Sequence, residues 1–311
     1  MGFTGVSRAD DENTVSVNPA GLGIHNDRYK RLSFMYSVNP KTMNPAVENN
    51  RFYEHTLSFC SQPSSKNIGG FGLLFNLPVW NPKDNEEKMI IDCVNQMPDS
   101  VSTTDKYLQL QTNLILSYSH DLSFIHLENH SLGMSFRLTH VYNSFLGIER
   151  TNNAAGMDIG YSGTFFDRLH LGLVFSHLDL YTEREEYLYQ QFPRFTGALG
   201  VHGLFSGCSR GKVSLFIESN YAHYLRYNRK DFHLWRNEMV NTGFDLTVFY
   251  FFYIRSGLSY DFHSHDKIVP WGFGLNFFNR YMVNFFHTAY ATQETDKKRF
   301  GISLSVINLF E

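Results

Sequence analysis

The sequence predicts an all-β chain that forms a 14-stranded antiparallel transmembrane β-barrel, and three observations lead to this fold class. Large apolar residues alternate with small polar ones at a period of two along most of the chain, and a helical period is almost absent. Aromatic residues make up 16% of the 311 residues, although the mean hydropathy is only −0.29. Short turns alternate with long polar segments, as they do in outer-membrane barrels.

The alternation is clearest in the segments 107–119, 131–139 and 168–176. The polar positions there hold mainly Gly, Ser, Thr and Asn, whereas a water-exposed face would hold more Lys and Glu. Small polar side chains suit a crowded barrel interior, with the apolar face turned to lipid. A soluble β-sandwich lectin or adhesin produces the same alternation and stays an alternative.

About fourteen strands can be placed from this pattern, and one turn decides whether their number is even. The segment 249–253 reads Phe-Tyr-Phe-Phe-Tyr, and a turn is needed there without Gly or Pro. Tight turns are expected at 166–168, 207–211 and 279–280, and long polar connections at 39–51, 80–105, 143–154, 179–194 and 226–238. The strands are expected to begin near residues 29, 52, 69, 106, 131, 155, 168, 195, 211, 239, 252, 268, 280 and 298.

Composition argues against several other classes of protein. The net charge of −3 gives no reason to expect a nucleic-acid partner. No run of 18 apolar residues is present, so membrane-spanning helices are not expected. Neither a Gly-x-Ser-x-Gly elbow nor a Gly-Lys phosphate loop occurs, so we expect no enzyme, no catalytic residue and no cofactor. The cysteines, Cys60, Cys93 and Cys208, form neither a metal-type pair nor a disulfide framework.

Two smaller features complete this survey. Asp261, His263 and His265 would share one face of an extended chain, but exposed histidines are ordinary at a strand end, so we expect no metal there. The first five residues, MGFTG, lack the basic start and apolar core of a signal peptide. We therefore expect a mature sequence to which a start Met has been added, and a cytosolic protein is the alternative.

The N-terminus carries a short motif that is informative only in this position, since Asn44-Pro45-Ala46 repeats part of it by chance. GFTGV at 2–6 and DDE at 10–12 precede NPAGL at 18–22. This arrangement resembles the N-terminus of the FadL-like long-chain fatty-acid transporter superfamily of outer-membrane barrels, including its PorV-like and spirochaete relatives. The strand number agrees, because the resemblance implies fourteen strands.

The resemblance implies that residues 1–28 form a hatch inside the lumen and that residues 29–311 form the barrel. A fourteen-stranded barrel is too wide for side chains alone to fill, so a plug is physically reasonable. Proline in the plug removes one N–H that would need a partner. A frayed N-terminus is the alternative. The expected hatch residues are Asn18, Pro19, Ala20 and Gly21.

The third expected strand is rich in residues that weaken sheet pairing. Glycines and a proline in a strand mark a bulge or kink. The resemblance implies an inward kink in this strand that opens a lateral exit into the membrane, and glycines at a tight turn are the alternative. The residues expected at this gate are Gly69, Gly70, Gly72 and Pro78.

Charged residues also fall on the small-residue face. Such charges usually pair with each other and brace the wall. The other hypothesis is that Arg137 or Arg255 binds a substrate carboxylate, because a guanidinium suits bidentate contacts. The lumen and head-group candidates are Arg137, Asp158, Glu218, Asp245 and Arg255.

Together these features predict a barrel in the outer membrane of a diderm bacterium that takes up hydrophobic molecules passively. Long-chain fatty acids are the substrates that the resemblance implies, with hatch displacement followed by lateral release into outer-membrane lipid. The alternative is a PorV-like barrel that does not transport and instead binds an exported protein or serves as a secretion-machinery subunit.

Overall fold

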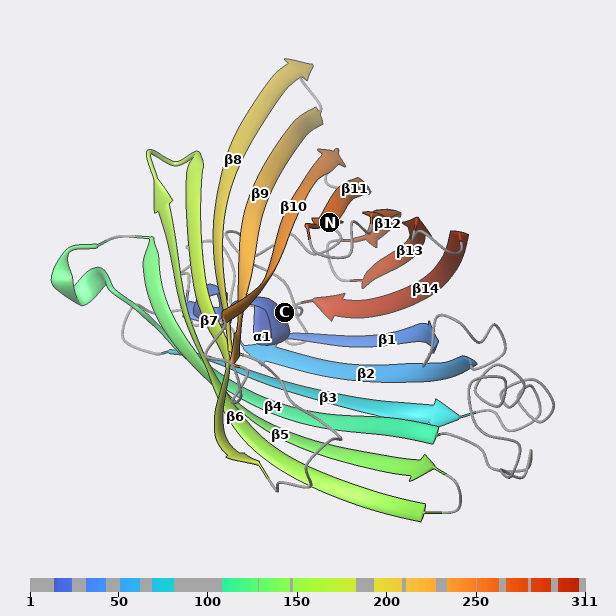
Figure 1. Ribbon diagram of the computed structural model, residues 1–311. Helices are drawn as coiled ribbons and strands as arrows, with labels where there is room; N and C mark the ends of the chain where they lie inside the picture. The colour runs from blue at the N-terminus through green and yellow to red at the C-terminus, as the bar shows by residue number, and fades with distance from the viewer. Residues whose placement is uncertain are drawn as a thin grey trace.

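The structure is a computed structural model of the whole chain (Figure 1). The residues that it describes are 14–23, 32–42, 51–61, 69–80, 108–127, 129–145, 148–182, 193–208, 211–227, 234–249, 251–262, 267–278, 281–291 and 296–307. No helix among them is long and apolar enough to cross a membrane.

Fourteen strands form one closed antiparallel barrel, in which β1 pairs with β14 and every other strand pairs with its neighbours along the chain. The predicted fold class is therefore confirmed, and the two-layer sandwich is wrong. The strands are β1 (Leu32–Thr42), β2 (Arg51–Ser61), β3 (Gly70–Trp80), β4 (Leu108–Asp121), β5 (His130–Phe145), β6 (Ile148–Phe165), β7 (Leu169–Thr182), β8 (Arg194–Cys208), β9 (Gly211–Tyr227), β10 (Leu234–Val248), β11 (Phe252–Asp261), β12 (Lys267–Phe277), β13 (Tyr281–Ala291) and β14 (Asp296–Ile307).

The two ends of the barrel differ in how the strands are connected. At one end, which we name the turn end, three residues join β6 to β7, β10 to β11 and β12 to β13. The other end, the loop end, carries the connection between β3 and β4, which spans residues 81–107. The turn predicted within 249–253 is present, with the N–H of Phe251 donating to the carbonyl of Val248. The strand number is therefore even.

One predicted connection is wrong. Residues 143–154 were expected to form a long polar loop, but β5 continues to Phe145 and β6 begins at Ile148. The polar stretch Glu149–Asn153 pairs residue by residue with Ser144–His140. Backbone pairing extends these two strands at the loop end, and it does not depend on an apolar face there.

The two faces of the wall have opposite character. Phe136, Leu138 and Ile159 lie on the outer face and are exposed, while their neighbours Ser135 and Asp158 point inward and are buried. The same alternation continues in most described strands, with further exposed apolar residues such as Leu57, Phe59, Leu73, Leu116, Leu132, Ile217, Phe273 and Leu304. The described wall is therefore apolar outside and polar inside, as the sequence predicted.

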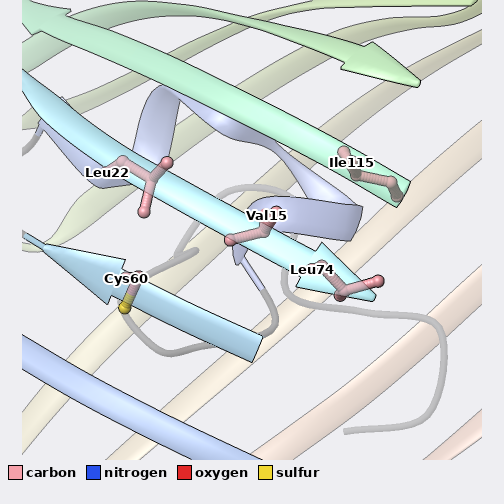
Figure 2. Close-up of a cluster of buried hydrophobic side chains, with 5 residues drawn as sticks. All are labelled: Val15, Leu22, Cys60, Leu74 and Ile115. Atoms are coloured by element: carbon pink, nitrogen blue, oxygen red, sulfur yellow. The ribbon is translucent and has the colours of Figure 1, made fainter. Parts of the chain in front are cut away.

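A short N-terminal segment lies inside the ring of strands (Figure 1). It consists of a helical turn, α1 (Thr14–Val17), and a 3-10 turn, η1 (Pro19–Gly23), whose five residues are all buried. Val15 and Leu22 of this segment pack in one cluster with Cys60, Leu74 and Ile115 of β2, β3 and β4 (Figure 2). We name residues 14–23 the luminal segment. The predicted boundary at residue 28 lies outside the described residues.

Candidate functional site in the barrel lumen

Asn18 fixes the luminal segment to the wall of the barrel. Its side-chain Nδ2 donates a hydrogen bond to the backbone carbonyl of Tyr161 on β6, at 3.0 Å. Its Oδ1 accepts from the N–H of Ala20 at 3.1 Å, and its own carbonyl accepts from the N–H of Gly21 at 3.1 Å. Asparagine readily makes such local turns, and the 3-10 turn therefore begins here. The residues predicted for a hatch do lie in the lumen, whereas their movement stays a prediction.

Serine hydroxyls of the inner wall donate hydrogen bonds to backbone carbonyls of the luminal segment. Ser131 Oγ donates to the carbonyl of Ala20 at 2.5 Å, and Ser119 Oγ lies 2.9 Å from the same oxygen. Ser119 Oγ is also 2.9 Å from the carbonyl of Leu132, so its single proton has two acceptors in reach. Ser117 Oγ donates to the carbonyl of Val15 at 3.4 Å. These contacts satisfy buried carbonyls that no strand pairs.

Glycines make room for the luminal segment on three strands. A Cβ atom on Gly70 of β3 would overlap the carbonyl oxygen of Leu22. One on Gly133 of β5 would overlap the backbone of Pro19 and Ala20, and one on Gly160 of β6 would overlap Asn18 Oδ1. Any larger residue at these positions would push the segment away from the wall, so the glycines form a cradle for it.

The cradle corrects the prediction of a gate at the β3 glycines. β3 pairs with β2 from Phe71 to Trp80, and with β4 from Gly70 to Asn76, without a register shift. The ladder around Gly70 and Gly72 is therefore unbroken. A Cβ on Gly72 would overlap Val15, and one on Gly69 would overlap the ring of Tyr118. Close packing therefore explains these glycines.

Among the described residues, the pairing between β3 and β4 ends before Pro78. β3 continues to Trp80 and β4 begins at Leu108, but the last residues paired between them are Asn76 and Asn113. The stretch of β3 without a described partner on β4 covers four residues, or roughly 13 Å of strand, and it still pairs with β2. Proline has no N–H to offer a neighbouring strand, which is consistent with a missing ladder here.

Arg137 and Asp158 form a buried ion pair next to the luminal segment. Arg137 Nη2 lies 2.6 Å from Asp158 Oδ2, and both side chains are largely buried. Arg137 Nη1 donates to His177 Nδ1 at 3.2 Å, and the His177 N–H donates to Asp158 Oδ1 at 2.8 Å. His177 lies where the register of β6 and β7 shifts, and its φ is 60°. Asp158 is two residues from Gly160, so this cluster borders the cradle on the inner face of β6.

The other predicted lumen charges lie on the far wall. Arg255 Nε donates to Asp245 Oδ2 at 2.9 Å, which joins β11 to β10. Glu218 on β9 is fully buried, with Asn220 Nδ2 at 3.5 Å from its Oε1. The five predicted charges therefore face inward as expected, but they lie in separate groups rather than in one site. Both arginines already contact an aspartate.

Sequence reasoning missed the residues that hold the luminal segment. Ser119, Ser131, Gly133 and Gly160 are recognisable in the sequence only as small residues of a lumen-facing pattern. Their role depends on the register between β4, β5 and β6, which a single sequence does not reveal. His263 and His265, which were considered as metal ligands with Asp261, lie outside the described residues. No group of three metal-binding side chains occurs among the described residues.

The fold is shared with several proteins of solved structure at very low sequence identity. The Ralstonia pickettii toluene transporter TbuX matches with a TM-score of 0.59 and 10% identity over 95% of this chain and 93% of that chain. The CymD monoaromatic hydrocarbon channel gives 0.56 and 10%, over 99% and 95%. A Pseudomonas aeruginosa FadL homologue gives 0.50 and 12%, over 97% and 96%. No protein-family model and no curated protein matches the chain.

Proposed function

We propose that the chain is an outer-membrane barrel that takes up hydrophobic molecules by passive diffusion. The observation that carries this proposal is the luminal segment, which packs in a glycine cradle inside a barrel with an apolar outer face. Its likeness in fold to TbuX, to CymD and to a FadL homologue supports the same function. A barrel that let small polar solutes diffuse freely would need an open lumen, whereas the luminal segment occupies part of this one.

We further propose long-chain fatty acids as the substrates, with Arg137 as the group that meets their carboxylate. Arg137 Nε is buried and has no hydrogen-bond partner among the described residues, so we take one donor of this guanidinium to be available to a substrate. Arg255, in contrast, uses its Nε on Asp245. A carboxylate at Arg137 would have to share the guanidinium with Asp158, so binding should be weak enough to allow release.

Passage would require the luminal segment to move, and release would follow through the wall. The segment touches β3, β4, β5 and β6, so its displacement would open that side of the lumen. The release point that we propose in place of the β3 glycines is the stretch of β3 beyond Asn76, which has no described partner on β4. It lies toward the loop end, where an apolar molecule could move sideways into lipid without crossing a paired ladder.

Mass spectrometry of molecules bound to the detergent-purified protein tests this function. We expect extraction of the native protein to yield fatty acids or other apolar small molecules above the level found with an unrelated barrel purified in parallel. Recovery of a stoichiometric polypeptide without such molecules would contradict uptake. It would favour instead the PorV-like role, in which the barrel binds an exported protein.

A further inference from the structure

Three phenylalanines at the turn end share an unusual backbone conformation. Phe166, Phe249 and Phe278 are each the first residue of a three-residue connection, between β6 and β7, β10 and β11, and β12 and β13. Their φ angles are 51°, 55° and 57°. Their side chains are 91%, 59% and 89% exposed. The same arrangement therefore occurs three times on one rim of the barrel.

The geometry of these turns does not explain why phenylalanine is present. Backbone with φ near 55° favours Gly, Asn and Asp, and a bulky residue there is an outlier. A phenyl ring that stands free in water also forfeits the free energy of apolar burial. Both effects favour a small polar residue at these positions. Three phenylalanines in that conformation thus indicate that their side chains are stabilised by an apolar environment outside the protein.

The tip at Phe278 continues the apolar outer face of β12. Phe251, in the turn after β10, packs edge-to-face on Phe277 at the end of β12, with ring centroids 5.7 Å apart. Phe277 directly precedes Phe278, and farther along the same outer face Phe273 stacks on Phe285 at 5.0 Å. On β12 the exposed apolar surface thus runs from Phe273 through Phe277 to the turn at Phe278.

Arginine follows the phenylalanine in two of these turns. The sequences are Phe166-Asp167-Arg168 and Phe278-Asn279-Arg280, and Arg168 is exposed. A guanidinium two residues from an apolar tip suits a phosphate group that lies just outside a hydrocarbon layer. Aromatic residues are enriched at that depth of a membrane for the same reason. Phospholipid offers both partners side by side.

We propose that Phe166, Phe249 and Phe278 insert into the phospholipid interface at the turn end, so that this rim is immersed among the lipid headgroups. The occupant of this surface is the bilayer leaflet in which the barrel sits, because the apolar surface is continuous with the wall. The inference rests on the membrane location in the proposed function. It adds how deep the turn end of the barrel lies in the membrane and which residues anchor it there.

Tryptophan fluorescence in phospholipid vesicles tests this inference on the full chain. Trp80→Phe and Trp235→Phe leave Trp271, which is exposed on the outer face of β12, as a reporter of the wall. Adding Trp271→Phe and then Phe278→Trp, or Phe166→Trp, places the single tryptophan at a tip. We expect lipids brominated near the glycerol end of the acyl chains to quench the tip reporters strongly. Acrylamide in the water should quench them little.

Quenching of Trp271, the reporter on the wall, distinguishes failure of the anchoring proposal from failure of the membrane location. If lipid bromine quenches Trp271 while acrylamide alone quenches the tips, the barrel is in the membrane and the proposed anchoring is overturned. The rim would then stand in water as a surface for a periplasmic protein. If lipid bromine fails to quench Trp271 as well, the membrane location itself is wrong, and the inference falls with it.

Discussion

The side-chain amide of Asn18 donates to the backbone carbonyl of Tyr161 at 3.0 Å, and this bond connects the luminal segment to strand β6. The residues are 143 positions apart in the chain. The bond is possible because Gly160, the neighbour of Tyr161, has no side chain where Asn18 lies. The N-terminal turn therefore packs against a strand from the middle of the chain because the asparagine supplies the hydrogen bond and the glycine leaves the space for it.

Gly133→Ala should displace the luminal segment. The added methyl group would overlap the backbone of Pro19 and Ala20, which cannot move aside as a flexible side chain could. We expect a loss of about 1–3 kcal/mol in the free energy of unfolding, as for other overpacked interiors. Single-channel conductance in a planar bilayer should rise at the same time. Gly197→Ala is the matched control, because its Cβ would meet only ordinary contacts at 3.7 Å and 3.8 Å. Equal effects of the two variants would contradict the cradle.

Ser119 and Ser131 should show coupled effects on stability. Both hydroxyls lie within hydrogen-bond distance of the Ala20 carbonyl, and the Ser119 proton can turn to it from the Leu132 carbonyl. Either serine alone therefore satisfies this buried oxygen, whereas Ser119→Ala with Ser131→Ala leaves it without these donors. We expect the double variant to cost about 1–3 kcal/mol more than the sum of the single ones. Urea unfolding in vesicles measures this difference, and strict additivity would show that the two hydroxyls act independently.

Cys60 should report on the position of the luminal segment. It is buried on the inner face of β2 in the cluster with Leu22 (Figure 2). In a Cys93→Ser, Cys208→Ser background, a maleimide should label Cys60 slowly in the otherwise native chain. Labelling should be at least roughly tenfold faster with Gly133→Ala, because opening the segment exposes the thiol. An unchanged rate, with the conductance raised, would place the opening elsewhere.

The two lumen ion pairs should differ in their contribution to stability. Asp158→Asn leaves the Arg137 charge in a site where its side chain is only 12% exposed. We expect a cost of about 3–5 kcal/mol, which is typical of a buried charge that loses its partner. Asp245→Asn should cost less, because water reaches the Arg255 side chain, which is 24% exposed. Equilibrium unfolding of both variants tests the ranking, and the reverse order would refute it.

The strands could be predicted from the sequence because one face of each is apolar and lies outside the barrel, and the other faces the lumen. Alternation at a period of two marks both faces, and most strand starts lie close to those expected. β6 was the exception, since its residues Glu149–Asn153 pair with β5 although their sequence shows no apolar alternation. The site was less predictable. NPAG indicated a luminal segment by resemblance, but Gly133, Gly160, Ser119 and Ser131 become recognisable only when the barrel brings them to one place.

Uptake by cells is the measurement that tests the central claim most directly. The chain would be produced in the outer membrane of a host that lacks its own barrel for hydrophobic molecules, and entry of a radiolabelled long-chain fatty acid would be followed with time. The account predicts faster entry than in cells with an empty vector, and competition by the unlabelled molecule. Entry no faster than in the empty-vector cells, from a barrel shown to be folded in that membrane, would contradict it.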